Sequence, residues 1–200
     1  MVGALKPVNN FILVKTLGIQ EKTDEGILLA GSSKVVKTRG TVISVGPGKT
    51  HPETGYRLGI PLEEGDGVLY GKYDGTEIDL DGEAHMLIRD DDVMVTYSGD
   101  KLELDTVSVI RDWVLVHVDT KDQETAGGLL LAAATSEQNR PSTGTVVKVG
   151  EGAVNGEGEL MPMTVSIGDR VKFRDYAGNE VEIEGEDYSV VRLADVLAKY

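Results

Sequence analysis

The sequence predicts an all-β fold of two tandem, partly open antiparallel β-barrels, each with a long mobile loop and a projecting hairpin. Three observations support this fold class. The chain repeats itself once, each half is a series of short apolar segments separated by turn residues, and no segment has helical periodicity over the length of a helix. The 200 residues include 25 glycines and only 5% aromatic residues, which is typical of short strands joined by tight turns.

The internal repeat has a nearly constant spacing. Ile27 lies 102 positions before Leu129, and Gly65 lies 103 positions before Gly168. Such a small drift indicates the duplication of a complete folded unit of roughly 100 residues, the size of a small domain. We therefore expect two domains, residues 1–99 and 100–200, joined by a short polar segment near residues 98–101.

The expected strands follow in the same order in both units. The first is densely apolar, as in a strand that is covered on both faces. A strand between glycines comes next, and a later strand alternates acidic and apolar residues, which marks one wet face. A brief turn precedes the closing strand. The expected strands are 11–14, 40–46, 68–70, 77–80, 86–88 and 93–97 in unit one, and 113–116, 144–150, 171–173, 180–183, 188–191 and the segment after 195 in unit two.

Two long segments, 17–39 and 120–143, do not fit the core of either barrel. Each is polar but contains three consecutive aliphatic residues, namely Ile27, Leu28 and Leu29 in unit one and Leu129, Leu130 and Leu131 in unit two. Loops longer than about 12–15 residues are uncommon in compact domains and are usually functional or disordered. The same triplet at the same place in both units favours a hydrophobic anchor for a groove on another protein over a short buried strand.

A second excursion in each unit, 48–64 and 151–166, contains a glycine-centred turn and then an apolar residue followed by proline. This pattern predicts a hairpin that projects from the barrel.

Composition excludes several classes of function. The net charge of -14 is shared almost evenly between the halves, so both would repel nucleic acid and anionic lipid. The longest apolar run, 128–134, is too short to cross a bilayer. The absence of cysteine excludes disulfides, thiolate metal sites and cysteine nucleophiles.

The chemical motifs in the sequence are weak. Residues 46–50 lack the spacing of a phosphate-binding loop. His51, His85 and His117 do not have the spacing of metal ligands, and we expect all three at the surface or rim of the barrels. The acidic run 90–92 lacks the spaced ligands of a calcium loop and is expected to form a turn before the last strand. We therefore expect no enzymatic activity, no cofactor and no bound metal.

In these residues and motifs, the chain resembles the GroES-like co-chaperonins, which are the lids of barrel-shaped chaperonins. The resemblance extends through both units and nearly the whole chain. The matching segments are 5–7, 26–29, 38–42, 45–48, 65–66, 73–77 and 92–94 in unit one, with counterparts at 128–131, 168–169 and 195–197 in unit two. The family usually has an Asp-Arg pair before the first core strand, whereas this chain has Asn9-Asn10 and Arg111-Asp112.

The resemblance implies that the loops dock their aliphatic triplets on a ring of the 60 kDa chaperonin class, which itself binds the nucleotide. It also implies a ring-shaped homo-oligomer, in which the first strand of one barrel pairs with the last strand of its neighbour. We expect four chains, giving eight barrels. Three chains and a single-barrel co-chaperonin, giving seven, stay open as an alternative.

The double-barrel arrangement resembles the plastid members of this family. The residues alone leave two locations open, the cytosol or a compartment reached by a mature form whose presequence has been removed. The resemblance implies the second, the chloroplast stroma, with this sequence as a mature form that lacks its transit peptide. One alternative function of another class is a barrel that binds single-stranded nucleic acid. The acidity of both halves and the scarcity of aromatic residues for base stacking oppose it. An oxidoreductase would need a glycine-rich dinucleotide turn, which the sequence lacks.

Overall fold

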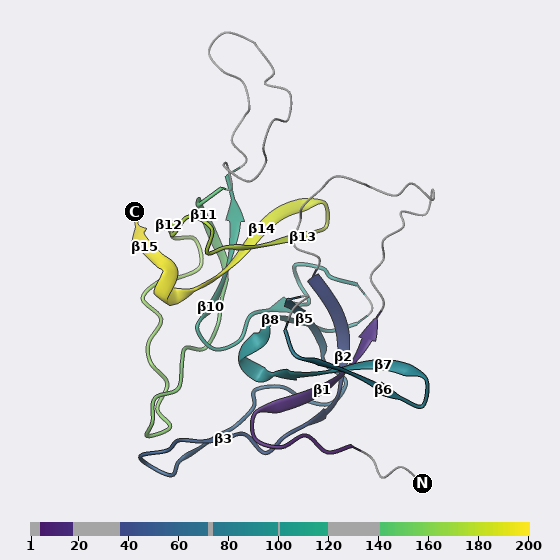
Figure 1. Ribbon diagram of the computed structural model, residues 1–200. Coiled ribbons are helices and arrows are strands. Elements are labelled where there is room, and N and C mark those ends of the chain that lie inside the picture. Colours follow the sequence, from purple (N-terminus) through teal and green to yellow (C-terminus); the bar gives the residue numbers. More distant parts are fainter. Residues whose placement is uncertain (1–4, 18–36, 72–73, 100, 120–140) are drawn as a thin grey trace, which may run out of the picture.

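The computed structural model describes residues 5–17, 37–71, 74–99, 101–119 and 141–200. These residues form two antiparallel β-structures that lie next to each other (Figure 1). The first described residues and the C-terminus lie on opposite sides of the molecule. The described part of the chain contains two short 3₁₀ turns, η1 (Asp90–Asp92) and η2 (Leu193–Asp195), and no α-helix.

Unit one is a seven-stranded sheet in the order β6-β7-β1-β2-β5-β8-β9, in which every neighbouring pair is antiparallel. Its densely apolar first strand lies near the middle of the sheet, where Ile12 and Val14 are fully buried. The strands are β1 (Phe11–Leu17), β2 (Lys37–Val45), β5 (Gly67–Gly71), β6 (Thr76–Leu80), β7 (Glu83–Arg89), β8 (Val93–Tyr97) and β9 (Val107–Ser108).

Unit two repeats this plan with six strands, in the order β13-β14-β10-β11-β12-β15. The repeat extends to irregularities of the backbone, because a β-bulge at Leu13/Val14 in β1 recurs at Leu115/Val116 in β10. The strands are β10 (Trp113–Val118), β11 (Thr143–Val149), β12 (Arg170–Phe173), β13 (Asn179–Ile183), β14 (Glu186–Arg192) and β15 (Val196–Lys199).

The projecting hairpins of the two units touch. In unit one, β3 (Lys49–Thr50) pairs with β4 (Arg57–Leu58), and in unit two a single bridge joins Val154 to Leu160. The hydroxyl of Thr54 donates a hydrogen bond to the carbonyl oxygen of Gly156 at 2.5 Å. This contact adds to the association of the two units.

The hydrophobic core does not divide at the boundary of the repeat. One cluster contains the core of unit one together with Trp113, Leu115 and Val190 of unit two, whereas a second cluster lies within unit two alone. Apolar residues from both units are thus removed from water in one continuous body, which stabilises their association.

The structure confirms the all-β fold with two antiparallel barrel units and the predicted order of strands. The connection between the units is more structured than the sequence suggested. Beyond the polar residues 98–101, Leu102, Val107 and Ile110 are buried, and β9 pairs with β8. An unpaired strand edge is a site for association, and β9 covers the outer edge of β8.

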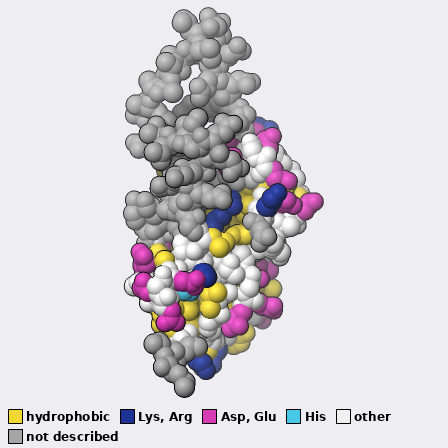
Figure 2. Space-filling model, turned by 90° about the vertical axis from the view of Figure 1, so that its right-hand side faces the viewer, with side chains coloured by type: hydrophobic (Ala, Val, Ile, Leu, Met, Phe, Trp, Pro, Cys, Tyr) yellow, Lys and Arg dark blue, Asp and Glu magenta, His cyan; other side chains and the backbone are white. Residues whose placement is uncertain are grey.

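The described surface is acidic. Figure 2 shows Asp and Glu side chains scattered over one face of the molecule, with hydrophobic side chains between them. Within the ranges described above, no helix has the length and apolar character needed to cross a bilayer.

Candidate functional site

The six aliphatic residues that the sequence nominates as the binding site lie outside the described residues. They are Ile27, Leu28, Leu29, Leu129, Leu130 and Leu131. The structure describes the strands that flank these segments, and we call the paired strand ends the loop bases.

Each loop base is a pair of adjacent antiparallel strands. In unit one Leu17 lies opposite Arg39, and in unit two Val118 lies opposite Gly144. The projecting hairpin leaves the opposite end of the same strand pair, after Val45 or Val149. Both units therefore present the loop segment at one end and the hairpin at the other.

A cross-strand pair of a basic and an acidic side chain lies near each loop base. Lys15 contacts Glu83 at 2.7 Å in unit one, and His117 contacts Glu186 at 3.2 Å at the equivalent position of unit two. The hydrogen bond from Lys15, together with its positive charge, lowers the pKa of Glu83. His85 is buried with its Nδ1 3.0 Å from the carbonyl oxygen of Glu83, so the expectation that all three histidines lie at the surface was wrong for His85.

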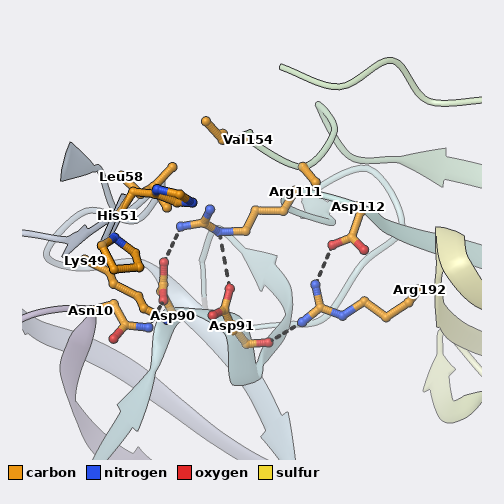
Figure 3. Close-up of a pocket in the computed structure, with 12 residues that line it drawn as sticks. Asn10, Lys49, His51, Leu58, Asp90, Asp91, Arg111, Asp112, Val154 and Arg192 are labelled. Carbon is orange, nitrogen blue, oxygen red and sulfur yellow. Dashed lines mark hydrogen bonds and ion pairs between the residues drawn. The ribbon is translucent and has the colours of Figure 1, made fainter. Parts of the chain in front are cut away.

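The junction between the units is built around the carboxylate of Asp90, which is 2% exposed (Figure 3). Asn10 of unit one donates a hydrogen bond from Nδ2 to Oδ1 of Asp90 at 2.8 Å. Arg111 of unit two donates to the other oxygen, Oδ2, and also to the carbonyl oxygen of Gly59 at 3.1 Å. Asp90 and Arg111 thus form an ion pair across the junction, where low solvent exposure reduces its screening.

A second arginine of unit two strengthens the same junction. Arg192 donates to Oδ1 of Asp112 at 2.5 Å and to the backbone carbonyl of Asp91 in unit one at 2.6 Å. Its guanidinium lies 3.9 Å from the centre of the Trp113 ring, a cation–π geometry. These contacts hold the Arg192 guanidinium between Asp112 of its own unit and the backbone of unit one (Figure 3).

A pocket of about 340 Å³ opens at this junction, and its lining includes Lys49, His51 and Arg111 as well as the three aspartates 90, 91 and 112. Arg111 and Arg192 already pair with Asp90 and Asp112. No group of three His, Cys, Asp or Glu side chains in the described part of the chain could hold a metal ion. The arrangement joins the two units.

The two outer faces of the molecule expose residues whose counterparts are buried at this junction. Met94 in β8 is 4% exposed, whereas its counterpart Leu197 in β15 is 58% exposed. Ile110 before β10 is 7% exposed, whereas its counterpart Val8 is 64% exposed. The junction inside the chain covers the end of unit one and the start of unit two, while the equivalent surfaces at the start of unit one and the end of unit two are open.

Sequence reasoning missed this junction as a functional feature. It correctly expected a turn at residues 90–92 before the last strand, but it did not predict that Asp90 is buried in η1 and pairs with Arg111. One signal was available, because the repeat aligns Arg111-Asp112 with Asn9-Asn10. The change in charge between these aligned pairs indicates that the two units meet different neighbours.

Comparison with known proteins agrees with the repeat. The family model described as "Chaperonin 10 Kd subunit" matches twice, over residues 4–97 and 106–200. A protein of Spinacia oleracea named "20 kDa chaperonin, chloroplastic" is 35% identical over 196 residues, which cover 98% of this chain and 74% of that protein. A protein of the same name from Arabidopsis thaliana is 34% identical over the same length.

Single-unit relatives match half of the chain. "Co-chaperonin GroES" of Lawsonia intracellularis is 42% identical over 96 residues, which are 48% of this chain and 94% of that protein. The double match, the two antiparallel barrel units and the similarity over 98% of this chain to relatives named as 20 kDa chaperonins lead to one conclusion: the chain belongs to the Chaperonin 10 Kd subunit family, as a member with two tandem GroES-like units.

Proposed function

We propose that this protein is a co-chaperonin that forms a ring-shaped lid and caps a chaperonin of the 60 kDa class, assisting nucleotide-dependent protein folding. Membership in the family supports the co-chaperonin role, since the relatives are named as chaperonins and co-chaperonins. The names of the two-unit relatives support a chloroplast location. We place the protein in the chloroplast stroma.

The main support for the proposed ring is the junction between the two units within the chain. There β9, just before the first core strand of unit two, pairs with β8, the last strand of unit one. The equivalent last strand of unit two, β15, pairs on one side with β12, and no other described strand pairs with its outer edge. A second copy of the chain would place its Leu5 and Lys6, the counterparts of Val107 and Ser108, along this edge.

Such a contact is heterologous: the end of one chain meets the start of the next, and repetition closes a ring if the rotation allows. The exposed residues Leu197 and Val8 would then be buried as Met94 and Ile110 are buried inside the chain. We propose a ring of four chains. Three chains combined with a single-unit co-chaperonin would form a seven-unit alternative.

In this proposal each aliphatic triplet docks in a groove of the chaperonin. Burying three aliphatic side chains contributes on the order of 5–8 kcal/mol. Every loop residue whose backbone becomes fixed on binding costs about 1–2 kcal/mol. A single loop therefore binds weakly, and the ring binds through many loops at once. The chaperonin supplies the nucleotide site, and the lid needs no cofactor of its own.

The test is co-sedimentation of the purified chain with a chaperonin ring in the presence of nucleotide. The variant L28D/L29D/L130D/L131D should lose binding to the chaperonin while keeping its circular dichroism spectrum and its oligomeric mass. Ile167→Asp is the matched control, since Ile167 is equally apolar, 67% exposed and distant in sequence from both loops. Full binding by the quadruple variant would overturn the assignment of the loops.

Ring formation is tested separately by native mass spectrometry. The wild type should form a closed oligomer at micromolar concentration, and Leu197→Asp should reduce the oligomer strongly by placing a charge in the proposed contact. The control Ile167→Asp should leave the oligomer intact. A wild type that stays a monomer would overturn the ring.

A further inference from the structure

The junction inside the chain and the proposed contact between chains use the same backbone geometry. Asn9 and Arg111 both adopt a left-handed conformation with φ of 53°, and the carbonyl oxygen of each accepts a hydrogen bond at 2.9 Å, from Gly48 and Gly152 respectively. The side chains of Asn9 and Arg111 therefore start from equivalent backbone positions in the two units.

The residues that face these positions are also equivalent. The backbone N–H of Asp90 in η1 donates to the carbonyl of Asn10 at 3.0 Å, and the N–H of Leu193 in η2 donates to the carbonyl of Asp112 at 2.9 Å. Asp90 and Leu193 thus begin the same 3₁₀ turn in the two units. Where Arg111 meets Asp90 inside the chain, Asn9 of a second copy would meet Leu193.

We propose that the pair Asn9 and Leu193 determines which partner the open end of unit two accepts. The inference rests on the ring proposed above. The accepted partner is a second copy of this chain, docked through unit one, whose Asn9 is neutral. The start of another copy's unit two, which carries Arg111, would be rejected if it were released from its own junction. The ring therefore has a charged junction within each chain and a neutral one between chains.

The energetic basis is the cost of a buried charge without its partner. Arg111 has a side chain only 11% exposed and is matched by Asp90. The same arginine docked on Leu193 would lose its carboxylate while remaining shielded from water, which is strongly unfavourable. Asn9 docked on Leu193 brings no charge that needs a partner.

The neighbouring positions, Asn10 in unit one and Asp112 in unit two, also differ between the units. In unit one Asn10 donates to Asp90, so the carboxylate has a neutral donor from its own unit. In unit two Asp112 takes the place of Asn10 and pairs with Arg192. A carboxylate at position 193 would have Asp112 as its close neighbour, and the apolar Leu193 avoids this repulsion.

The test uses the full-length chain in two single variants, Asn9→Arg and Leu193→Asp. In either variant alone, every contact between chains joins one altered residue to one unaltered residue at positions 9 and 193. Each variant should therefore need a protein concentration roughly tenfold or more above that of the wild type to assemble to the same extent. Mixed in equal amounts, they offer two matched contacts: the new arginine meets the new aspartate, and the unaltered Asn9 meets the unaltered Leu193. The mixture should form an oligomer of alternating composition, measured by native mass spectrometry, and added salt should weaken it more than the wild type.

Leu193 packs against the core of unit two, so folding is checked with Leu193→Asn, which is polar but uncharged. Restoration by mixing shows that each single variant is folded. If both single variants assemble like the wild type, or if the mixture of folded variants stays dissociated, the proposal is wrong. A wild type that never assembles would instead overturn the ring itself, which separates the two failures.

Discussion

The ring of Tyr97 lies directly over Gly67 of the neighbouring strand, because a Cβ atom at position 67 would come within 2.6 Å of Cε2 of the tyrosine. The counterpart of Gly67 in unit two is Arg170, which pairs with Asp119. The counterpart of Tyr97 is Tyr200, which is 69% exposed. The glycine thus allows the last residue of β8 to be buried in unit one, where burial also raises the pKa of Tyr97.

Gly67→Ala should displace the Tyr97 ring and lower stability. Overpacking of this kind costs about 1–3 kcal/mol, and the melting temperature should fall by several degrees. Gly59→Ala is the control, since a Cβ there has no neighbour within 4 Å and the backbone is not left-handed. Equal melting temperatures for the two variants would contradict the described packing.

Asp90→Asn should destabilise the junction between the units. The substitution leaves Arg111 shielded without its carboxylate, and breaking a buried pair by removing one partner costs about 3–5 kcal/mol. The thermal unfolding midpoint should drop on the order of 10 °C. Asp91→Asn should have a small effect, because Asp91 is 53% exposed and lies 3.8 Å from Arg111. A small effect at both positions would show that the ion pair contributes little.

The two units should unfold together, because one core cluster contains residues of both. The single tryptophan, Trp113, lies in β10 of unit two and packs in this shared cluster, so its fluorescence reports on the cluster. Ile88→Ala in unit one should cost about 2–5 kcal/mol and shift the denaturation midpoint equally by Trp113 fluorescence and by far-UV circular dichroism. Two separate transitions, with the fluorescence midpoint unchanged, would mean that the units are independent.

The stability contributed by Asp169 should depend on pH. A hydrogen bond from the backbone of Ser166 and another from Lys199 hold the pKa of Asp169 below its ordinary value of 3.8. A lowered pKa means that this contribution is present above the ordinary value and is lost as the pH falls through the lowered one. Asp169→Asn should therefore lower the melting temperature at pH 7, with a gap to the wild type that narrows below about pH 3.8. Asp105→Asn is the control at pH 7, where replacing this exposed side chain should change the melting temperature little. A constant gap across this range would exclude the ionic origin.

The strands were predictable because each has a local signal. The apolar run that begins at Phe11 indicates a buried strand, and the acidic alternation around Ile78 indicates a strand with one wet face. The duplication repeats each of these patterns in unit two. The junction was not predictable in the same way. Asp90 and Arg111 are 21 residues apart, and a single sequence does not show that η1 carries the first against the start of the next unit. Strand β9 has only two residues, too few for any periodicity to appear. The role of the aliphatic triplets stays a prediction from the repeat and from the family.

The pairing of β8 with β9 also determines how the proposed ring would respond to dilution. Both strands belong to one polypeptide, so their association is independent of protein concentration, whereas any contact made by β15 with another chain is concentration-dependent. In a ring of such chains, half of the contacts between neighbouring units lie within a chain, and only the other half depend on protein concentration. On dilution the ring would break into two-unit arcs and not into single barrels, and each arc would keep its two loop bases in one polypeptide.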